Sequence, residues 1–463
     1  MKGEPPGFSH GEDVRVTYNP SEPGYFDDED LRGEMDRVFD LCHGCRLCFN
    51  LCPSFPTLFS YVDAHDGDAS AMSRAEQDQV VDECYQCKLC YAKCPYVPPH
   101  EWELDFPRLM MRAHAVAKRT GAPLRERMTD QVMNRTDLVG KLSSALAPLV
   151  NRLVSEPETL ARRVMEGATG ISSKRLLPPY RRQRFTTWFA RRAGMAGRPS
   201  DGVAGSAGTP GSAGTERKVS VFPTCFIEYM APGIGKDLVR VYEHNGVRCS
   251  LPAGTRCCGA PWLHSGNVDQ FVSSARANVA SLAPEVRAGC DVIVAQPTCA
   301  YVLRKDYPLY LGTPDAQLVA EHTFDPAEYL MALHKAEGGG LRTDFVAVES
   351  GQVPARVTYH LACHLRAQMI GFKSRDLLKV AGIAVDMIQE CSGIDGTWGY
   401  RAANYDLARK VAEPLRRKVA DIPGQDVCGD CHLANVAIYE ETGKRSVHPI
   451  ELLAMAYGLH EEG

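Results

Sequence analysis

Two identical cysteine motifs constrain the fold of this chain more than any other feature. They are Cys42-x2-Cys45-x2-Cys48-x3-Cys52-Pro53 and Cys84-x2-Cys87-x2-Cys90-x3-Cys94-Pro95. The short loops let three thiolates of a motif converge on one cluster, while the fourth cysteine, beside proline, points toward the other cluster. Structural zinc sites, which usually use separated cysteine pairs, fit this spacing poorly. The motifs therefore predict a domain that is built around iron–sulfur clusters.

The crossed ligation pattern assigns all eight cysteines to two [4Fe–4S] clusters, as in bacterial two-cluster ferredoxins. We expect one cluster on Cys42, Cys45, Cys48 and Cys94, and the other on Cys84, Cys87, Cys90 and Cys52. A polar, alanine-bearing stretch at 69–81 is compatible with a helix, so a helical ferredoxin domain is expected. Such a pair of clusters serves one-electron transfer.

The number of cysteines also bears on the compartment. The chain has 463 residues and 18 cysteines, which is too sparse for a disulfide scaffold. Its N-terminus has no apolar core, and its apolar stretches are shorter than the roughly 18 residues of a membrane span. We therefore expect a cytoplasmic protein in which clustered cysteines bind metal. The net charge of −5 names no partner.

Charge and composition divide the chain into six expected parts. Residues 1–40 hold eleven Asp/Glu against four Lys/Arg, a net charge of −7, which with their prolines predicts an extended arm. Residues 108–198 hold 19 Lys/Arg against 6 Asp/Glu, a net charge of +13. The expected parts are an acidic arm (1–40), the ferredoxin domain (41–120), a basic helical region (121–193), a flexible Gly/Ser/Ala linker (194–217) and two cysteine-rich modules (218–335 and 336–463).

The part after the linker alternates between expected strands and helices, which implies parallel α/β units. Expected strands are 218–222, 291–295, 356–359 and 384–388, and expected helices are 234–244, 268–287, 374–380, 407–419 and 434–441. The cysteine groups follow strands, where ligands bind in open α/β sheets.

These cysteines form an internal repeat. The first copy has Cys225, Cys257-Cys258-Gly259 and Cys299, and the second has Cys363, Cys391-Ser392-Gly393, Cys428 and Cys431. Each copy thus offers four cysteines, the usual complement of a cubane, and one or two further clusters are expected. Cys249 and Cys290 lie outside the groups and are interpreted as ordinary buried thiols. In the alternative interpretation, one module is degenerate and free of metal.

Two ferredoxin motifs followed by duplicated Cys…CCG…CxxC modules resemble the heterodisulfide reductase-related (CCG-domain) iron–sulfur proteins. These include the C subunit of anaerobic glycerol-3-phosphate dehydrogenase and the iron–sulfur subunit of glycolate oxidase. The resemblance covers about residues 40–120 and 218–457, and is closest at YHLACHLRAQMIGFKSRDLLKVAG and CSGIDGTWG. It implies an α+β multidomain fold with a helical two-cluster ferredoxin domain and a duplicated α/β cysteine-rich domain. It also implies an electron-transfer subunit that relays electrons from a flavoprotein dehydrogenase towards membrane quinone.

The chain departs from the disulfide-cleaving members of this group. In the heterodisulfide reductase B subunit each module supplies five cysteines, whereas Gln296 and Ser392 replace the fifth cysteine here. The departure favours Cys225, Cys257, Cys258 and Cys299, and Cys363, Cys391, Cys428 and Cys431, as ligands of relay clusters. A catalytic subunit that reduces a disulfide or thiol-linked substrate is the first alternative, and a non-catalytic redox sensor or partner protein is the second.

Other motifs carry less weight. Gly233-Ile234-Gly235 is followed by Leu238 where a dinucleotide fingerprint has its third glycine, so no bound nucleotide is expected and flavin belongs to a partner. His360, His364 and His432 flank cluster cysteines, either as hydrogen-bond partners that tune a cluster or as ordinary polar loop residues.

The basic segment 174–192 interleaves Lys and Arg with Leu, Tyr, Phe and Trp. This composition favours a peripheral contact with the inner face of the cell membrane or with a quinone-reacting protein. A protein partner, a solvated connector and, last, nucleic acid are the alternatives. Taken together, the sequence predicts the electron-transfer subunit of an oxidoreductase complex rather than a stand-alone enzyme.

Overall fold

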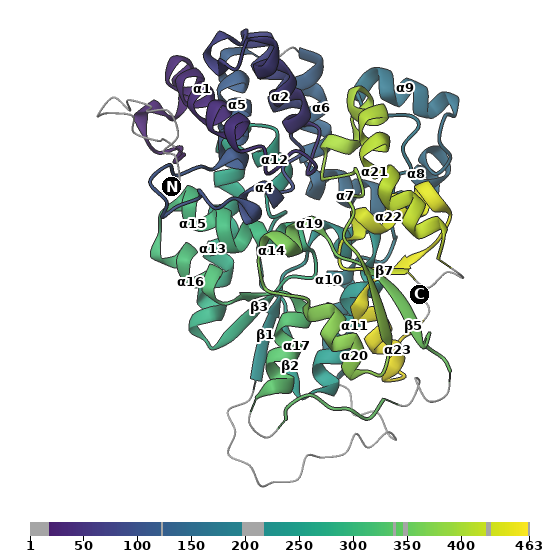
Figure 1. Ribbon diagram of the computed structural model, residues 1–463. Helices are drawn as coiled ribbons and strands as arrows, with labels where there is room; N and C mark the ends of the chain where they lie inside the picture. Colours follow the sequence, from purple (N-terminus) through teal and green to yellow (C-terminus); the bar gives the residue numbers. More distant parts are fainter. Residues whose placement is uncertain are drawn as a thin grey trace.

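A computed structural model describes residues 18–121, 124–196, 217–336, 339–345, 351–422 and 427–461 (Figure 1). Residues 1–17 of the expected arm and residues 197–216 of the expected linker lie outside these ranges. A helical N-terminal half is followed by two four-stranded parallel sheets with surrounding helices. None of the helices in the described ranges combines the length and apolar character that crossing a bilayer requires.

The dicluster region is helical, as the polar, alanine-bearing stretch at 69–81 predicted. It consists of short helices that pack their apolar faces around one core, which includes Met35, Phe39, Phe55 and Leu109. Its elements are η1 (Pro23–Phe26), α1 (Asp28–Cys45), α2 (Ser54–Ala64), η2 (Ala69–Ala71), α3 (Arg74–Asp82) and α4 (Leu89–Lys93).

The expectation of an extended acidic arm is wrong for residues 28–40, which form most of α1. The Asp27 side chain caps the helix by accepting a hydrogen bond from the backbone N–H of Asp30 at 2.8 Å. Three acidic residues in the first turn lie where the helix dipole favours negative charge. Leu31, Met35, Val38 and Phe39 follow a helical period and are buried, so the high acidity concealed an amphipathic helix.

In the described ranges between residues 106 and 196, which include the expected basic region, the chain forms six helices. They are α5 (Phe106–Gly121), α6 (Leu124–Asn134), α7 (Thr136–Ala145), α8 (Ala147–Val154), α9 (Leu160–Thr169) and α10 (Phe185–Ala196). α5 packs on α1 in the dicluster core, and α10 packs on α11 beside the first sheet. These helices therefore connect the dicluster region to the α/β part through packed contacts.

The first sheet has the strand order β2-β1-β3-β4, and all of its strands are parallel. Two of its helices have the predicted bounds within two residues, because runs of apolar residues at helical spacing end at Asn-Gly or Gly. The elements are β1 (Arg217–Val221), η3 (Phe226–Met230), α11 (Pro232–His244), β2 (Val247–Ser250), α12 (Ala260–His264), α13 (Val268–Arg287), β3 (Cys290–Ile293), α14 (Pro297–Tyr301), η4 (Val302–Asp306), α15 (Tyr307–Leu311), α16 (Pro314–Glu321), β4 (Thr323–Phe324) and α17 (Pro326–Lys335).

The second sheet has the corresponding order β6-β5-β7-β8 and is also parallel. Its elements are β5 (Arg356–His360), α19 (Cys363–Ala367), α20 (Lys373–Val380), β6 (Ala384–Ile388), η5 (Trp398–Tyr400), η6 (Ala402–Asn404), α21 (Tyr405–Ala420), β7 (Val427–Gly429), α22 (His432–Thr442), β8 (Ser446–Val447) and α23 (Pro449–Ala456). α20 and α23 bury Leu377, Ile450 and Leu453 in the core of the first sheet, so the two halves share one core (Figure 1).

Candidate metal centres

The first cysteine site lies at the end of α1. Cys42, Cys45, Cys48 and Cys94 line one cavity, which is the set that crossed ligation predicted. Arg46 ends the helix in a left-handed conformation, so the chain turns and brings Cys48 back toward Cys42. Burial raises the pKa of the Cys48 thiol to about 11 and raises that of Cys42 further, so without metal both thiols hold their protons.

The second site is more enclosed. Cys84, Cys87 and Cys90 are buried and line a cavity with Cys52, again the predicted set. Burial raises the pKa of each of these four thiols, for Cys84 to about 11. Four convergent thiols with no imidazole or carboxylate in the lining form a soft donor set, which fits an iron–sulfur cluster at each of the two sites.

Lys88 is a site residue that the sequence analysis missed. Its side chain lines the second cavity and is 2% exposed. The ammonium donates a hydrogen bond to Gln86 Oε1 at 2.6 Å and contacts Met111 Sδ at 3.4 Å. No carboxylate in the described part of the chain lies within ion-pair distance of it. A buried ammonium without a counter-ion is rare, and only its position between Cys87 and Cys90 could have indicated its role.

The first α/β half gathers the four expected thiols in one place. Cys225, Cys257, Cys258 and Cys299 line an apolar cavity of about 210 Å³. Cys225 follows β1, the Cys257–Cys258 pair follows β2, and Cys299 lies on α14 after β3, so three strand ends converge. Hydrogen bonds from the thiols of Cys225 and Cys258 lower the pKa of Cys257, whereas the hydrogen bond to Cys257 and burial raise the pKa of Cys225.

The glycine of each cysteine-rich motif has a conformational role. Gly259 and Gly393 have φ of +90° and +66°, in the left-handed region that favours glycine. A Cβ on Gly393 would lie 2.2 Å from the carbonyl oxygen of Ala408, so no larger residue fits. These glycines therefore allow a tight turn directly after the motif cysteines. The N–H of Gly393 donates a hydrogen bond to Cys391 Sγ at 3.3 Å.

The second α/β half gathers three of its four expected cysteines. Cys363, Cys391 and Cys431 line a cavity of about 530 Å³, together with Ser392. Cys428 does not line this cavity, contrary to the expectation. It lies within β7, fully buried in the core beside Val357 and Tyr359, because the strand continues through this position and only Cys431 reaches the following turn.

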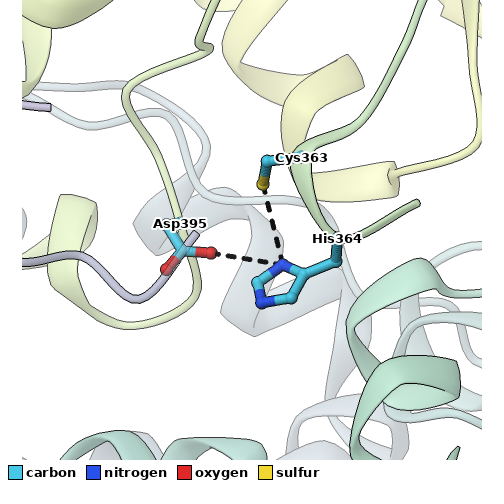
Figure 2. A group of neighbouring side chains, drawn as sticks. All are labelled: Cys363, His364 and Asp395. Carbon is cyan, nitrogen blue, oxygen red and sulfur yellow. Dashed lines mark hydrogen bonds and ion pairs between the residues drawn. The ribbon is translucent and has the colours of Figure 1, made fainter. Parts of the chain in front are cut away.

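His364 and Asp395 lie beside these thiols. His364 Nδ1 is 3.6 Å from Cys363 Sγ and 3.7 Å from a carboxylate oxygen of Asp395, and all three ligand atoms lie within 4.8 Å of one another (Figure 2). Burial lowers the pKa of His364 to about 3 and raises the pKa of Asp395 to about 7. The sequence analysis missed Asp395, although it lies four residues after Cys391.

The other two predicted histidines also lie near this cavity, His360 buried and His432 half-buried. A ring nitrogen of His360, Nε2, donates to the carbonyl of Glu390 at 2.9 Å, and burial lowers the pKa of the imidazole. His432 begins α22 and packs against Phe226, and burial lowers its pKa to about 4. Its backbone N–H donates to Gln296 Oε1, while Gln296 Nε2 donates to Cys431 Sγ at 3.2 Å. Gln296 of the first half therefore serves the site of the second half.

The cavities adjoin in an order that differs from the order of the chain. Cys52 and Cys87 of the second dicluster site also line the cavity of the second α/β half. Thr298, Gly396 and Leu433 line both this cavity and that of the first α/β half. The site of the second α/β half therefore lies between the second dicluster site and the site of the first α/β half.

The basic segment 174–192 does not present the aromatic surface that its composition predicted. Phe185 is fully buried, and Trp188 and Phe189 pack against the core of the first sheet. Arg175 is also fully buried, donating to the Gly399 carbonyl at 2.8 Å and forming an ion pair with Glu440 at 2.6 Å. The segment uses these residues to bind the α/β part.

An exposed apolar surface lies instead on α7, α8 and α9, which we call the leucine face. Each of these consecutive helices leaves two apolar side chains exposed at i and i+4, and Leu160 is 79% exposed. Four cations among them, Arg135, Lys141, Arg152 and Arg163, are exposed and have no ion-pair partner in the described ranges. The apolar residues are Leu138, Leu142, Leu146, Leu149, Leu153, Leu160 and Val164.

Comparison with protein families agrees with these sites. Residues 34–95 match the 4Fe-4S dicluster domain, and residues 219–304 match the cysteine-rich domain (CCG). The first match contains all eight cysteines of the two dicluster sites, and the second contains the four thiols of the first α/β half.

The chain is also similar to components of known redox proteins. The C subunit of the anaerobic glycerol-3-phosphate dehydrogenase of Escherichia coli (strain K12) is 28% identical over 351 residues, which are 75% of this chain and 81% of that protein. The B subunit of the fumarate reductase (CoM/CoB) of Methanothermobacter marburgensis is 29% identical over 52% of this chain and 46% of its own length. The lactate utilization protein A of Geobacillus thermodenitrificans is 28% identical over 40% of this chain and 75% of its own length.

These similarities confirm the resemblance that the motifs indicated. With a 4Fe–4S dicluster domain, a cysteine-rich domain and thiol sites that suit iron–sulfur clusters, the chain is an iron–sulfur electron-transfer protein that resembles the C subunit of anaerobic glycerol-3-phosphate dehydrogenase over three quarters of its length.

Proposed function

We propose that this protein relays electrons from a flavoprotein dehydrogenase towards membrane quinone through four iron–sulfur centres. The observation that carries the proposal is the set of four cysteine-lined cavities, of which three adjoin in a series and share lining residues. A series of adjacent one-electron sites is suited to conduction rather than to bond chemistry at one place. The relative's name, a dehydrogenase subunit, supports a dehydrogenase as donor.

The side chains of the protein would hold, insulate and bias these centres. An iron–sulfur cluster, when bound, takes up and releases single electrons with little rearrangement. Because the pKa of most ligand thiols is raised by burial, cluster binding displaces their protons, and a filled site therefore excludes proton exchange at sulfur. Phe55, Phe59 and Leu104 contribute apolar side chains to the lining of the first site, in which Cys45 is exposed.

The first α/β half is the proposed exit of the relay. Its cavity is lined by apolar side chains, among them Val132 and Met133 of α6 and Val139 of α7. α7 also carries part of the leucine face. Apolar surface with unpaired cations suits the interface of an anionic bilayer, so this end of the relay would face the membrane that holds quinone.

The two α/β halves are proposed to be a duplicated module, with boundaries near 218–335 and 336–463. The identical strand order and the corresponding positions of the cysteine turns support this proposal. The other proposed parts are the arm and dicluster domain up to about residue 120, the helical region at 121–193 and the linker at 194–217.

Electron transfer from an artificial donor to a quinone tests the relay. Anaerobically purified protein should hold about sixteen iron atoms, four for each centre. It should reduce a water-soluble quinone when a reduced dye supplies electrons. Cys391→Ala, which removes a thiol from the site of the second α/β half, should abolish quinone reduction. Cys290→Ala should leave it unchanged, because Cys290 is a buried cysteine of β3 outside all four sites.

Two results would contradict the relay. Undiminished quinone reduction by Cys391→Ala would show that electrons bypass the central site. Reduction of a disulfide by the dye-reduced protein, without quinone reduction, would favour the catalytic alternative, for which the large cavity beside Cys363 leaves room.

Binding to vesicles tests the membrane contact. Wild-type protein should sediment with phosphatidylglycerol vesicles at low salt, and the binding should weaken with salt because each cation contributes only about 1 kcal/mol, which is screened. A triple variant with Leu142, Leu149 and Leu160 changed to Gln should lose this binding. Met369→Gln, at a 70% exposed residue of the second α/β half, is the matched control. If the triple variant binds like wild type, the leucine face is not the contact.

A further inference from the structure

The metal site of the second α/β half lacks its fourth cysteine, because Cys428 lies in the strand core. We propose that Asp395 takes this place, so that the centre is held by the thiolates of Cys363, Cys391 and Cys431 and by one carboxylate. The inference rests on the proposed presence of an iron–sulfur centre in this half, but not on the direction of electron flow.

Geometry places Asp395 beside Cys363, in the cavity that all three thiols line. Its carboxylate lines the same cavity, and one oxygen belongs to the group with Cys363 and His364 in which all ligand atoms lie within 4.8 Å. Its side chain is 7% exposed, and its second oxygen, Oδ2, has no hydrogen-bond partner in the described part of the chain. A buried carboxylate oxygen without a donor is costly, and a bound cation would remove this cost.

His364 is the nearest competing ligand, but its surroundings differ. Its Nδ1 lies 3.2 Å from Thr298 Oγ1 and 3.6 Å from Cys363 Sγ. Its other nitrogen, Nε2, is buried and has no hydrogen-bond partner among the residues that the structure describes. We therefore place His364 beside the centre and not among its ligands. Its ring stacks on that of His264, with the ring centroids 6.3 Å apart.

A carboxylate ligand gives this centre a chemical signature. Oxygen is a harder and weaker ligand for cluster iron than thiolate, so the iron bound by Asp395 is the one most readily lost. Ferricyanide removes one electron from a [4Fe–4S] cluster, and departure of one ferrous ion then leaves a three-iron cluster and a free carboxylate. The EPR signal of a three-iron cluster reports this loss directly.

The test uses the whole, anaerobically purified protein with ferricyanide as the oxidant. Wild type should release about one iron atom per chain at a low excess of ferricyanide, with a three-iron signal that is absent in Cys391→Ala. Asp395→Cys should keep its iron under the same conditions, because all four ligands are then thiolates. Cys428→Ala should match wild type in iron, sulfide and EPR signal, as should Cys290→Ala, which removes a buried cysteine from the corresponding strand of the first sheet.

Several outcomes would overturn the assignment. Loss of about four iron atoms in Cys428→Ala, but not in Cys290→Ala, would restore Cys428 as the ligand; this comparison stands even if Asp395→Cys does not fold. Release of iron by Asp395→Cys as readily as by wild type would exclude the carboxylate. Abolished iron release in His364→Cys alone would transfer the role to His364. None of these measurements depends on quinone reduction, so they fail or succeed separately from the proposed relay.

Discussion

Replacement of Lys88 tests whether a buried charge sets the potential of the second dicluster centre. The lysine is enclosed beside the four ligand thiols, and its hydrogen-bond partner is the neutral amide of Gln86. A nearby positive charge favours the reduced, more negative state of a cluster and so raises its reduction potential. Lys88→Gln removes the charge and should lower the potential.

The magnitude follows from Coulomb's law. A unit charge on the order of 8 Å from the centre of a cluster interacts with one added electron by roughly 2 kcal/mol at an effective dielectric constant of about 20. For a one-electron couple, in which roughly 1.4 kcal/mol corresponds to about 59 mV, this equals a shift of roughly 80 mV. Because the side chain is 2% exposed, water screens this interaction little.

Redox-titrated EPR measures the shift. Lys88→Gln should keep the iron content and lower the midpoint of one dicluster signal, whereas Lys88→Arg, which retains the charge, should keep the midpoint near that of wild type. Lys93→Gln is the matched control, since Lys93 is an exposed cation beside the first site, and its removal should have a much smaller effect. Equal midpoints for Lys88→Gln and wild type would refute the reasoning.

Three further predictions concern buried groups near the sites. Burial raises the pKa of Asp306 to about 6, so its ionisation destabilises the folded state as pH rises through about 4 to 6. Above pH 6 the free energy of unfolding of Asp306→Asn should exceed that of wild type by up to about 3 kcal/mol, and this difference should disappear at pH 4. Ser392 lines the cavity of the second α/β half. If its hydroxyl donates a hydrogen bond to the cluster, Ser392→Ala should keep the iron content and lower the reduction potential of that centre, whereas loss of iron would make Ser392 a ligand. Gly393→Ala should lose the centre of the second α/β half because its Cβ meets the Ala408 carbonyl, whereas Gly396→Ala, also at positive φ but with no neighbour nearer than 3.9 Å, should retain it. Equal iron contents in the two variants would contradict the role of this clash.

Local patterns in the sequence predicted most of the regular elements. The strand at 384–388 and the helix at 268–287 have the predicted bounds, because short β-branched runs and long apolar periods between glycines are determined locally. The eight dicluster cysteines were placed by spacing alone, since their loops are too short to allow other groupings.

The errors arose where tertiary contacts decide. Whether Cys428 faces a cavity depends on how far β7 extends, which the CxxC spacing does not contain. The composition around Trp188 suggested a surface element because the sequence does not show that the core of the first sheet covers these aromatic residues. Lys88 and Asp395 stand out only because they are buried, which the sequence does not show. The start of α1 was not predicted as a helix because its first turn is rich in acidic residues.

The contact between the dicluster region and the second α/β half has a consequence for oxygen tolerance. Trp398 of that half donates a hydrogen bond to the carbonyl of Asp82 at 2.7 Å, and its ring lies against Tyr85. Together with Cys52 and Cys87, Tyr85 forms one wall of the cavity that holds Cys363 and Cys391. The dicluster region thus covers the thiols of Cys363 and Cys391. Its removal would expose them to dioxygen, and exposed thiolates are the ones that oxidise.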